Sequence, residues 1–381
     1  MRHRYARAGR LRRSALLAET CEVCGYDRKY AIKLLNGRVV RRHGRRGRKR
    51  GYDDIIEPLK TIWMLSEQLC GKRLKPALPQ WLPHYERHRG PLSEEQREKL
   101  LRISPAQIDR LLAPARLARP AKAKTPKPGS LLLAREIPLS IDSPRPPDRP
   151  GWLETDTVAH CGGDMSGGFV WSVTFTCPCS GWTENRAIWR RSPSALVAQT
   201  RDVEASIPFA LAGLDFDNGT EYLNEQFIAF CREHNPPIPM SRSRAYRKND
   251  NAHVEQKNWT HVRQLLGYER FKDPRLVALL NDLYKKYWCP FHNFFQPSAK
   301  LAGKTRVGSR YRKRYDPPTT PCDRLLKSPW LSDQQKAALT RTRDRLDPFL
   351  LKQRIEEKLN QIFAIVAADT RSGACPRSHV A

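Results

Sequence analysis

The sequence predicts a mixed α/β core with a five-stranded sheet, preceded by small all-α modules. After Gly151, short apolar runs alternate with amphipathic helical segments, which is the pattern of an α/β domain. Before residue 118 the chain instead carries helical segments with N-terminal caps. A stretch rich in proline and lysine separates the two regions, because proline interrupts both helices and central strands.

Composition points to a polyanionic partner. The chain has 381 residues, enough for two or three domains, and 39% hydrophobic residues, enough for real cores. Its formal net charge of +30 makes nucleic acid the first candidate partner and an anionic membrane surface the second. No apolar run is long enough to span a bilayer, and the basic N-terminus lacks the apolar core of a secretory signal. We therefore expect no membrane insertion and a cytoplasmic location.

Five regions are expected along the chain. They are a helix-turn-helix with a basic arm, a second helix-turn-helix unit, a Pro/Lys-rich linker, the α/β core and a basic C-terminal segment with helices. Their bounds, in this order, are 1–50, 51–117, 118–150, 151–296 and 297–381.

The first region reads as helix, turn, helix. Asp27 is the expected N-cap of its second helix and Gly37 the C-terminal stop. The arginine-rich run that follows is too charged to pack. It is a mobile linker or a phosphate-binding strap, and both readings can hold together.

The second region carries two capped helices. Ser93 with Gln96 forms a capping box, and Ser104 with Gln107 repeats the device, with Pro105 at the first helical position. Two capped helices joined by a short turn favour a helix-turn-helix, whose second helix enters the major groove of DNA. An ordinary αα-hairpin gives the same pattern, so both interpretations remain open.

The α/β core has a readable element order. Strands are expected at 152–160, 169–177, 183–190, 209–216 and 237–243, and helices at 193–206, 220–234 and 252–268. Three strands, a helix, a strand, a helix, a strand and then helices is the order of ribonuclease H-like folds.

Three carboxylates have positions that allow a shared site. Asp156 lies in the first strand, Asp217 ends the fourth, and Glu255 lies in the long helix after the fifth. Asp217 alone is also explained as a residue that hydrogen-bonds its own Asn-Gly turn. Asp215 is a rival to Asp217, because residues two apart on a strand share a face.

Glu255 is singled out by its place on the helix. At 100° per residue it falls inside an apolar stripe with Val254, Val262 and Leu266. A carboxylate on a core-facing stripe is costly unless it is paired or metal-bound. A Glu that reaches an arginine at the edge of the stripe is the alternative.

The segments "ETDTVAHCGG", "LDFDNGTEYLN" and "NDNAHVEQKNW" resemble the three signatures of the integrase catalytic core. That core defines the D-D-E group of retroviral-type integrases and bacterial insertion-sequence transposases. The resemblance covers roughly residues 151–295. It implies that Asp156, Asp217 and Glu255 are the catalytic triad, and it includes the Glu-x-x-Asn pair of Glu255 and Asn258.

The resemblance implies a DNA transposase or integrase that cleaves the ends of a mobile element and joins them to target DNA. It further implies two Mg²⁺ or Mn²⁺ ions on the triad, double-stranded DNA as partner, a homo-oligomer, and a place in the bacterial cytoplasm with the nucleoid. Two alternatives stay open: a structure-selective nuclease on the same fold, and a transposase-derived DNA-binding protein without catalysis.

Basic and polar residues are expected to hold the DNA. Val262 stands where family members often carry a lysine, with Arg263 beside it. The segment 241–251 is read as a mobile active-site loop over DNA, or else as an ordinary exposed loop. The residues expected to contact DNA are Arg41, Arg42, Arg45, Arg46, Arg244, Arg247, Lys248, Asn258, Arg263, Arg312, Lys313 and Arg314.

The cysteines do not form a zinc-finger pattern. Cys21 and Cys24 form a C-x-x-C, and Cys177 and Cys179 form a C-x-C, without a second ligand pair at finger spacing. Free reduced cysteines are the simplest account. A metal held by His160, Cys161, Cys177 and Cys179 is the alternative.

Overall fold

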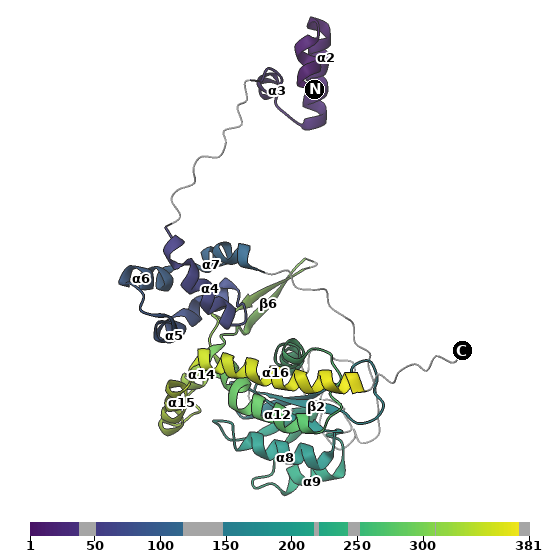
Figure 1. Ribbon diagram of the computed structural model, residues 1–381, viewed down its shortest axis with the longest axis vertical. Helices are drawn as coiled ribbons and strands as arrows, with labels where there is room; N and C mark the ends of the chain where they lie inside the picture. The colour runs from purple at the N-terminus through teal and green to yellow at the C-terminus, as the bar shows by residue number, and fades with distance from the viewer. Residues whose placement is uncertain (38–50, 117–147, 217–220, 243–251, 309, 373–381) are drawn as a thin grey trace, which may run out of the picture. The chain divides into compact units, whose positions relative to one another are not determined.

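Figure 1 shows the structure of the protein, a computed structural model. It describes residues 1–37, 51–116, 148–216, 221–242, 252–308 and 310–372. The chain forms two compact units, Met1–Asp53 and Asp54–Ala381.

The first unit is a three-helix module. Its helices are α1 (Arg2–Arg7), α2 (Arg10–Cys24) and α3 (Arg28–Leu35). They enclose a small core that consists of Tyr5, Leu16, Leu17, Ala31 and Leu35. The expected N-cap is confirmed, because the Asp27 carboxylate accepts a 2.9 Å hydrogen bond from Lys29 N. Helix α1 adds to the predicted helix, turn, helix.

The second unit begins with a helical part. Its elements are η1 (Asp53–Ile55), α4 (Ile56–Leu65), α5 (Gly71–Arg89), α6 (Glu94–Arg102), α7 (Pro105–Leu112) and η2 (Ala113–Ala115). The capping box of Ser93 and Gln96 is confirmed in both directions, at 3.0 and 3.2 Å. Ser104 caps α7 as predicted, accepting from Gln107 N at 3.2 Å. A DNA-reading role for α6 and α7 stays a prediction.

The core of the second unit is a mixed five-stranded sheet. The strands are β1 (Trp152–Ala159), β2 (Val170–Thr176), β3 (Thr183–Trp189), β4 (Gly213–Phe216) and β5 (Met240–Arg242). Their order is β3-β2-β1-β4-β5. β2 runs antiparallel to β1 and β3, while β1, β4 and β5 are parallel. The predicted α/β core with five strands is therefore present, in an order compatible with a ribonuclease H-like core.

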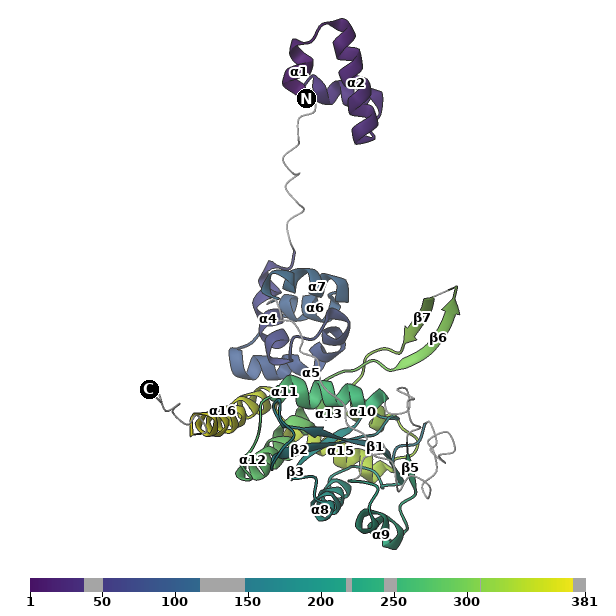
Figure 2. The same cartoon turned by 90° about the vertical axis from the view of Figure 1, so that its right-hand side faces the viewer.

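Helices cover both faces of the sheet. In Figure 2, α8 and α9 lie below it and α10, α11 and α13 above it. The bounds are α8 (Pro193–Glu204), α9 (Glu225–Glu233), α10 (Ala252–Lys257), the π-helix η4 (Asn258–Arg263), α11 (Gln264–Leu266), α12 (Arg275–Leu283), the π-helix η5 (Tyr284–Trp288) and α13 (Cys289–Phe295).

Helix α9 starts later than the sequence pattern predicts. Asn224 caps it, accepting a 2.9 Å hydrogen bond from Phe227 N. The preceding Tyr222 is instead fully buried, with its ring stacked 5.0 Å from that of Phe216. Packing of this tyrosine on the sheet therefore displaces the start of the helix.

The expected core-facing position of Glu255 is wrong. Val254, Val262 and Leu266 are fully buried, but Glu255 is exposed. The reason is the π-helix η4, which begins at Asn258. A π-helix closes i→i+5 rather than i→i+4 hydrogen bonds, so the 100° step does not carry across it. Because the 100° projection included residues beyond Asn258, it placed the centre of the predicted apolar stripe too close to Glu255.

Strand β3 is an edge of the sheet, and polar side chains cover its backbone. Asn293 accepts from Thr183 N and donates to Thr183 O, both at 2.9 Å. Asn281 does the same with Ala187, at 2.7 and 3.0 Å. Between them, Asn185 N donates to a cysteine sulfur of α13 at 3.2 Å.

The C-terminal segment contains a hairpin and three helices. Its elements are β6 (Leu301–Val307), β7 (Arg310–Tyr315), α14 (Pro321–Leu326), α15 (Asp333–Arg345) and α16 (Pro348–Ser372). The helices agree with the expectation for this segment, whereas the hairpin was not predicted. Within the described ranges, no helix has the length and apolarity to cross a membrane.

The helical part packs on the core and on α16. Trp81 of α5 donates to the Phe295 carbonyl at 3.3 Å, and Arg73 donates to the Pro297 carbonyl at 2.6 Å. At the start of α16, Asp347 lies 2.9 Å from His88 and 3.2 Å from Arg87. The second unit is thus one packed body from its first helices to its last.

Candidate active site

The site is built on strand β1. Glu154 and Asp156 lie two residues apart and therefore share one face of the sheet. Asp156 pairs with Thr174 of the neighbouring strand and is half-buried. A carboxylate inside a strand is disfavoured unless hydrogen bonds or charges hold it.

Glu154 holds the start of helix α10. Its side chain is 1% exposed, and Oε2 accepts a 3.1 Å hydrogen bond from Val254 N. Oε1 lies 3.0 Å from Nδ1 of His253. A carboxylate at a helix N-terminus satisfies an otherwise unpaired N–H and complements the helix dipole. The sequence analysis did not single out Glu154, although an acid two residues before Asp156 on a buried strand is a usable signal.

Asp156 and Asn258 join the first and third motifs. Asn258 Nδ2 donates to Asp156 Oδ2 at 2.7 Å, and Oδ1 of Asp156 accepts from the N–H of Thr157 at 2.7 Å. Farther along, Arg263 donates to the Ala159 carbonyl at 2.9 Å. Because the contacts follow the same order on both segments, α10 and η4 run alongside β1 in the same direction.

Glu255 lies one turn before Asn258. Residues three apart on a helix lie on the same side, so Glu255 and Asn258 face the same region. Glu255 is exposed while Asn258 is half-buried against Asp156. Glu255 is therefore an exposed carboxylate one turn from the residue that contacts Asp156.

Asp217 lies outside the described residues. The parallel register of β1 and β4 runs from Trp152 opposite Gly213 to Thr155 opposite Phe216. The triad therefore stays a prediction. Within the described part of the chain, no group of three or more His, Cys, Asp or Glu side chains is placed to hold a metal ion.

The rival carboxylate, Asp215, lies inside the sheet. It pairs with Glu154 on one side and Ser241 on the other, and only 1% of it is exposed. It shares the β1 face that carries Asp156. Its depth indicates a structural position in the sheet.

The second motif is anchored on the opposite face of β1. Thr157 Oγ1 donates to the buried Glu221 at 2.6 Å, and Thr155 Oγ1 lies 2.8 Å from the Tyr222 hydroxyl. Arg191 forms an ion pair with Glu221. This role of Glu221 was missed from sequence, although the residue lies inside the quoted motif.

Two of the expected DNA-contacting residues are engaged with the chain itself. Asn258 holds Asp156, as described above. Arg263 donates to the carbonyls of Ala159 and Gly267, and its guanidinium lies 4.8 Å from the Tyr268 ring centroid. Burial lowers the pKa of Arg263. Contact of these two residues with DNA stays a prediction.

A lysine that the sequence analysis did not use lies between Glu255 and Asn258. Lys257 Nζ is 3.4 Å from Nε2 of His261. Burial, together with the positive charges of Arg73 and Arg324, lowers the pKa of Lys257 to about 7.

The β6–β7 hairpin presents an exposed basic surface, and Figure 2 shows it projecting from the body of the unit. Arg312, Lys313 and Arg314 are all exposed. Lys313 lies opposite Lys304, whose Nζ is 4.1 Å from the Tyr311 ring centroid. Residues 301–315 contain no Asp or Glu. The sequence signal that was missed for this hairpin is the Gly-Ser pair at 308–309, which is typical of a turn between two strands.

The remaining expected DNA contacts lie outside the described residues. They are Arg41, Arg42, Arg45, Arg46, Arg244, Arg247 and Lys248. The expected active-site loop, 241–251, is described only at Ser241 and Arg242.

The four-residue metal alternative is not supported. His160 is fully buried, with Nε2 2.8 Å from Ser172 and its ring stacked on Phe271. Within the described ranges no metal-holding group is formed, and Cys21, Cys24, Cys161, Cys177 and Cys179 are free thiols. Burial opposes ionisation of Cys177, but hydrogen bonds from Cys179 and Ser180 lower its pKa to about 6.

The fold and site define a class of protein: a mixed α/β protein compatible with a ribonuclease H-like core, with an acidic strand bound to a Glu-x-x-Asn helix. The chain belongs to the same family as the uncharacterized protein y4rM of Sinorhizobium fredii (strain NBRC 101917 / NGR234). The two are 39% identical over 323 residues, which is 84% of this chain and 91% of the relative. No family model matches the sequence.

Among solved structures, two integrase chains match part of this chain. The catalytic core domain of BIV integrase is 14% identical, with a TM-score of 0.29 over 47% of this chain and 95% of that chain. A chain of the simian T-cell lymphotropic virus intasome in complex with PP2A regulatory subunit B56 gamma is 15% identical, with a TM-score of 0.26. That match covers 44% of this chain and 54% of the other.

Proposed function

We propose that the protein is a D-D-E transposase or integrase, which cleaves the ends of a DNA element and joins them to target DNA. One observation carries the proposal. The Asn of the Glu-x-x-Asn helix donates a 2.7 Å hydrogen bond to the Asp of the first motif strand, 102 residues earlier. Two motifs that were recognised separately are thereby in contact.

The donor set fits hard divalent cations. Asp156 and Glu255, with Asp217 from the second motif, offer carboxylate oxygens without thiols or imidazoles, which suits Mg²⁺ or Mn²⁺. The two Asp156 oxygens accept hydrogen bonds from Thr157 N and Asn258 Nδ2, which orient the carboxylate. Two bound ions would supply an activated water or 3′-hydroxyl and a stabilised leaving oxygen.

The residues of the chain then position this donor set. Asn258 fixes the orientation of Asp156, and Glu154 fixes the start of the helix that carries Glu255. Because both contacts start from β1, a strand in the middle of the sheet, the acidic groups are held by a rigid element. Neither hydrolysis nor strand transfer requires a protein nucleophile.

Charge supports DNA as the substrate. The net charge of +30 and the exposed basic hairpin favour binding through phosphates. A two-stranded ribbon also has the width to enter the major groove. We further propose that the protein works as a homo-oligomer on double-stranded DNA in the bacterial cytoplasm, associated with the nucleoid.

The deciding experiment uses a labelled duplex made from the DNA that flanks the gene, with Mg²⁺ or Mn²⁺ present. We expect the rates of cleavage and joining to fall by several factors of ten in each of three variants: Asp156→Asn, Asp217→Asn and Glu255→Gln. One factor of ten corresponds to ~1.4 kcal/mol of activation free energy. Asp215→Asn is the matched control and should keep most of the chemistry in the folded fraction. If all four variants stay active, the triad is not the catalyst.

The same assay separates the alternatives. Nicked products without joined products would favour a nuclease. DNA binding without either product, together with no Mn²⁺ binding, would favour a regulatory DNA-binding protein. If Asp215→Asn is inactive and Asp217→Asn is active, Asp215 takes the place of Asp217 in the triad.

A further inference from the structure

A pocket of about 430 Å³ lies near the end of the sheet toward which β1 runs. It is formed by the β1–β2 connection, the start of β2 and the turn after β3. Its volume falls within the range of small-ligand sites. The lining residues are Met165, Gly167, Phe169, Trp171, Arg190 and Arg191.

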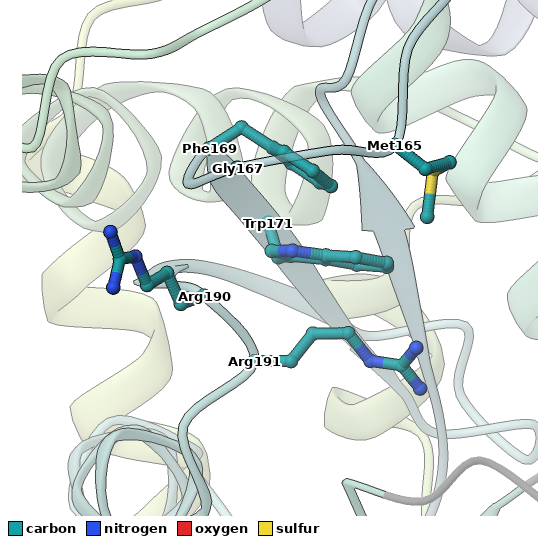
Figure 3. Close-up of a pocket in the computed structure, with 6 residues that line it drawn as sticks. All are labelled: Met165, Gly167, Phe169, Trp171, Arg190 and Arg191. Carbon is teal, nitrogen blue, oxygen red and sulfur yellow. The ribbon is translucent and has the colours of Figure 1, made fainter.

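Aromatic rings and an arginine form one wall. The rings of Phe169 and Trp171 are stacked, with centroids 5.3 Å apart, and the Arg191 guanidinium carbon lies 4.6 Å from the Trp171 centroid. Figure 3 shows the Trp171 ring between Phe169 and Arg191, with Met165 beside it. Met165 is 52% exposed, whereas both rings are buried and fixed.

The two arginines follow each other in a strained turn. Arg190 has φ +58° and Arg191 has φ +51°. Both values lie in the left-handed region, which residues other than glycine disfavour. Ser192 N donates to the Trp189 carbonyl at 3.4 Å and closes the turn. Strained backbone of this kind is found most often at binding and catalytic sites, where the surrounding structure holds it in place.

The opposite wall is held in place. Arg270 donates to the Cys161 carbonyl at 3.0 Å, and its guanidinium lies 5.3 Å from the Phe169 ring centroid. A Cβ on Gly168 would lie 2.7 Å from side-chain atoms of Trp189 and Arg190. The loop therefore approaches the arginine turn as closely as glycine permits, and the pocket is formed before any ligand binds.

The lining is cationic and contains no carboxylate. Arg191 pairs with the buried Glu221, which also binds Thr157, the residue after Asp156. Arg190 is exposed and faces away from this pair. The nearby Asp164 carboxylate accepts hydrogen bonds from Ser166 at 2.6 and 2.8 Å and so closes its own turn.

We propose that this pocket binds one unstacked nucleotide of a DNA strand. The base contacts Met165 and the ring edges of Phe169 and Trp171, and the phosphate pairs with Arg190. An inorganic anion would not need the rings, and an apolar ligand would not need the arginines. Trp171 pairs with Ala159 and therefore lies on the face of β1 opposite Asp156, so the nucleotide binds on the other face of the sheet from the candidate active site. This inference rests on DNA being the substrate.

The test measures binding without chemistry, in EDTA, with the full chain. Single-stranded oligonucleotides carry 5-iododeoxyuridine at successive positions, and ultraviolet cross-links are located by peptide sequencing. We expect cross-links to Met165, Phe169 or Trp171. Replacing one nucleotide by an abasic residue should weaken binding severalfold at the same oligonucleotide position, because the base contacts with Met165 and the ring edges are lost.

Variants separate a binding role from a structural one. Met165→Ala and Arg190→Gln should each weaken binding severalfold, whereas the exposed controls Met64→Ala and Arg341→Gln should not. Arg190→Gly should weaken binding while raising the free energy of unfolding, because glycine relieves the positive φ. If Arg190 had only a structural role, a variant with a higher free energy of unfolding would not bind DNA more weakly.

Two results would overturn the inference. One is cross-links that map only to other surfaces, such as the β6–β7 hairpin. The other is a decrease in affinity in the pocket variants no larger than in their controls. Failure of the proposed function looks different: cross-links would appear in the pocket, but no cleavage or joining would occur with Mg²⁺ or Mn²⁺.

Discussion

Asn258 donates through Nδ2 to Oδ2 of Asp156 across 2.7 Å, and this contact joins a π-helix to the central region of the sheet. π-helical turns are rare and often occur at functional sites. Here the π-helix begins at the residue that touches the acidic strand. The extra residue in the turn therefore changes the direction of every side chain after Asn258.

The first prediction concerns that contact. Asn258→Ala should lower the single-turnover cleavage rate about 10- to 100-fold, the range seen when a ligand-orienting partner is removed. DNA affinity should fall less than the cleavage rate, because phosphate contacts of many other residues supply most of the binding. Gln256→Ala, on an exposed position of the same helix, is the control. Equal rates for both variants would contradict an orienting role.

The second prediction concerns the basic hairpin. Replacing Arg312, Lys313 and Arg314 together by Ala should reduce the slope of log K against log salt by about 0.9 for each DNA phosphate that these side chains neutralise. The control removes three other exposed charges, Lys327, Arg341 and Arg345. Both triple variants change net charge equally, so an effect specific to the hairpin excludes a general charge effect. Identical slopes would remove the hairpin from the DNA-binding surface.

The third prediction concerns the start of α16. Asp347 accepts from Phe349 N at 2.9 Å and lies beside His84, Arg87 and His88. Asp347→Ala removes a helix cap and a partly buried ion pair, so the free energy of unfolding should fall by about 2 kcal/mol.

Hydrogen exchange in that variant should rise first in the opening turn of α16. The control is Asp344→Ala. Asp344 is 65% exposed, and its 3.8 Å separation from Arg343 makes a long, weak ion pair. Unchanged stability in the Asp347 variant would mean that the apolar contacts of Phe349 hold this junction alone.

The fourth prediction concerns pH. Burial, and then the positive charge of Arg263, lowers the pKa of His160 to about 3. The unfolded chain therefore binds a proton at His160 near pH 6.5, where the folded protein does not. The stability from this group is present above about pH 6.5 and is lost as pH falls towards about 3.

Urea unfolding of wild type and His160→Gln tests the sign. Between about pH 4.5 and 6, the wild type should lose about 1.4 kcal/mol per pH unit more than the variant. His261 and His292, whose pKa values burial also lowers, are present in both proteins and cancel. Parallel stability profiles would show that His160 does not contribute.

Local signals explain the parts of the fold that were predicted. The capping residues Asp27 and Ser93 act on donors two or three residues away, so their spacing is visible in the sequence. The start of α9 was misplaced because the packing of Tyr222 on Phe216 of β4 is a tertiary contact that no periodic pattern in the sequence reveals.

In the candidate site, too, local motifs were visible in the sequence and long-range contacts were not. Asp156, Glu255 and Asn258 were found through their motifs, but the contact of Asp156 with Asn258 spans 102 residues and requires the folded sheet. The exposure of Glu255 could not be derived from a constant helical step, because the π-helix interrupts it. Glu154 was overlooked because its partners, His253 and the N–H of Val254, lie 99 and 100 residues later in the sequence.

The covered edge of β3 has a consequence for how copies of the chain assemble. Side chains of Asn281, Cys289 and Asn293 occupy the backbone groups that a further strand would need. An unprotected edge invites strand addition from another chain and, in the extreme, aggregation. At these positions the backbone of β3 is already hydrogen-bonded, so the proposed homo-oligomer would have to form without strand addition at this edge.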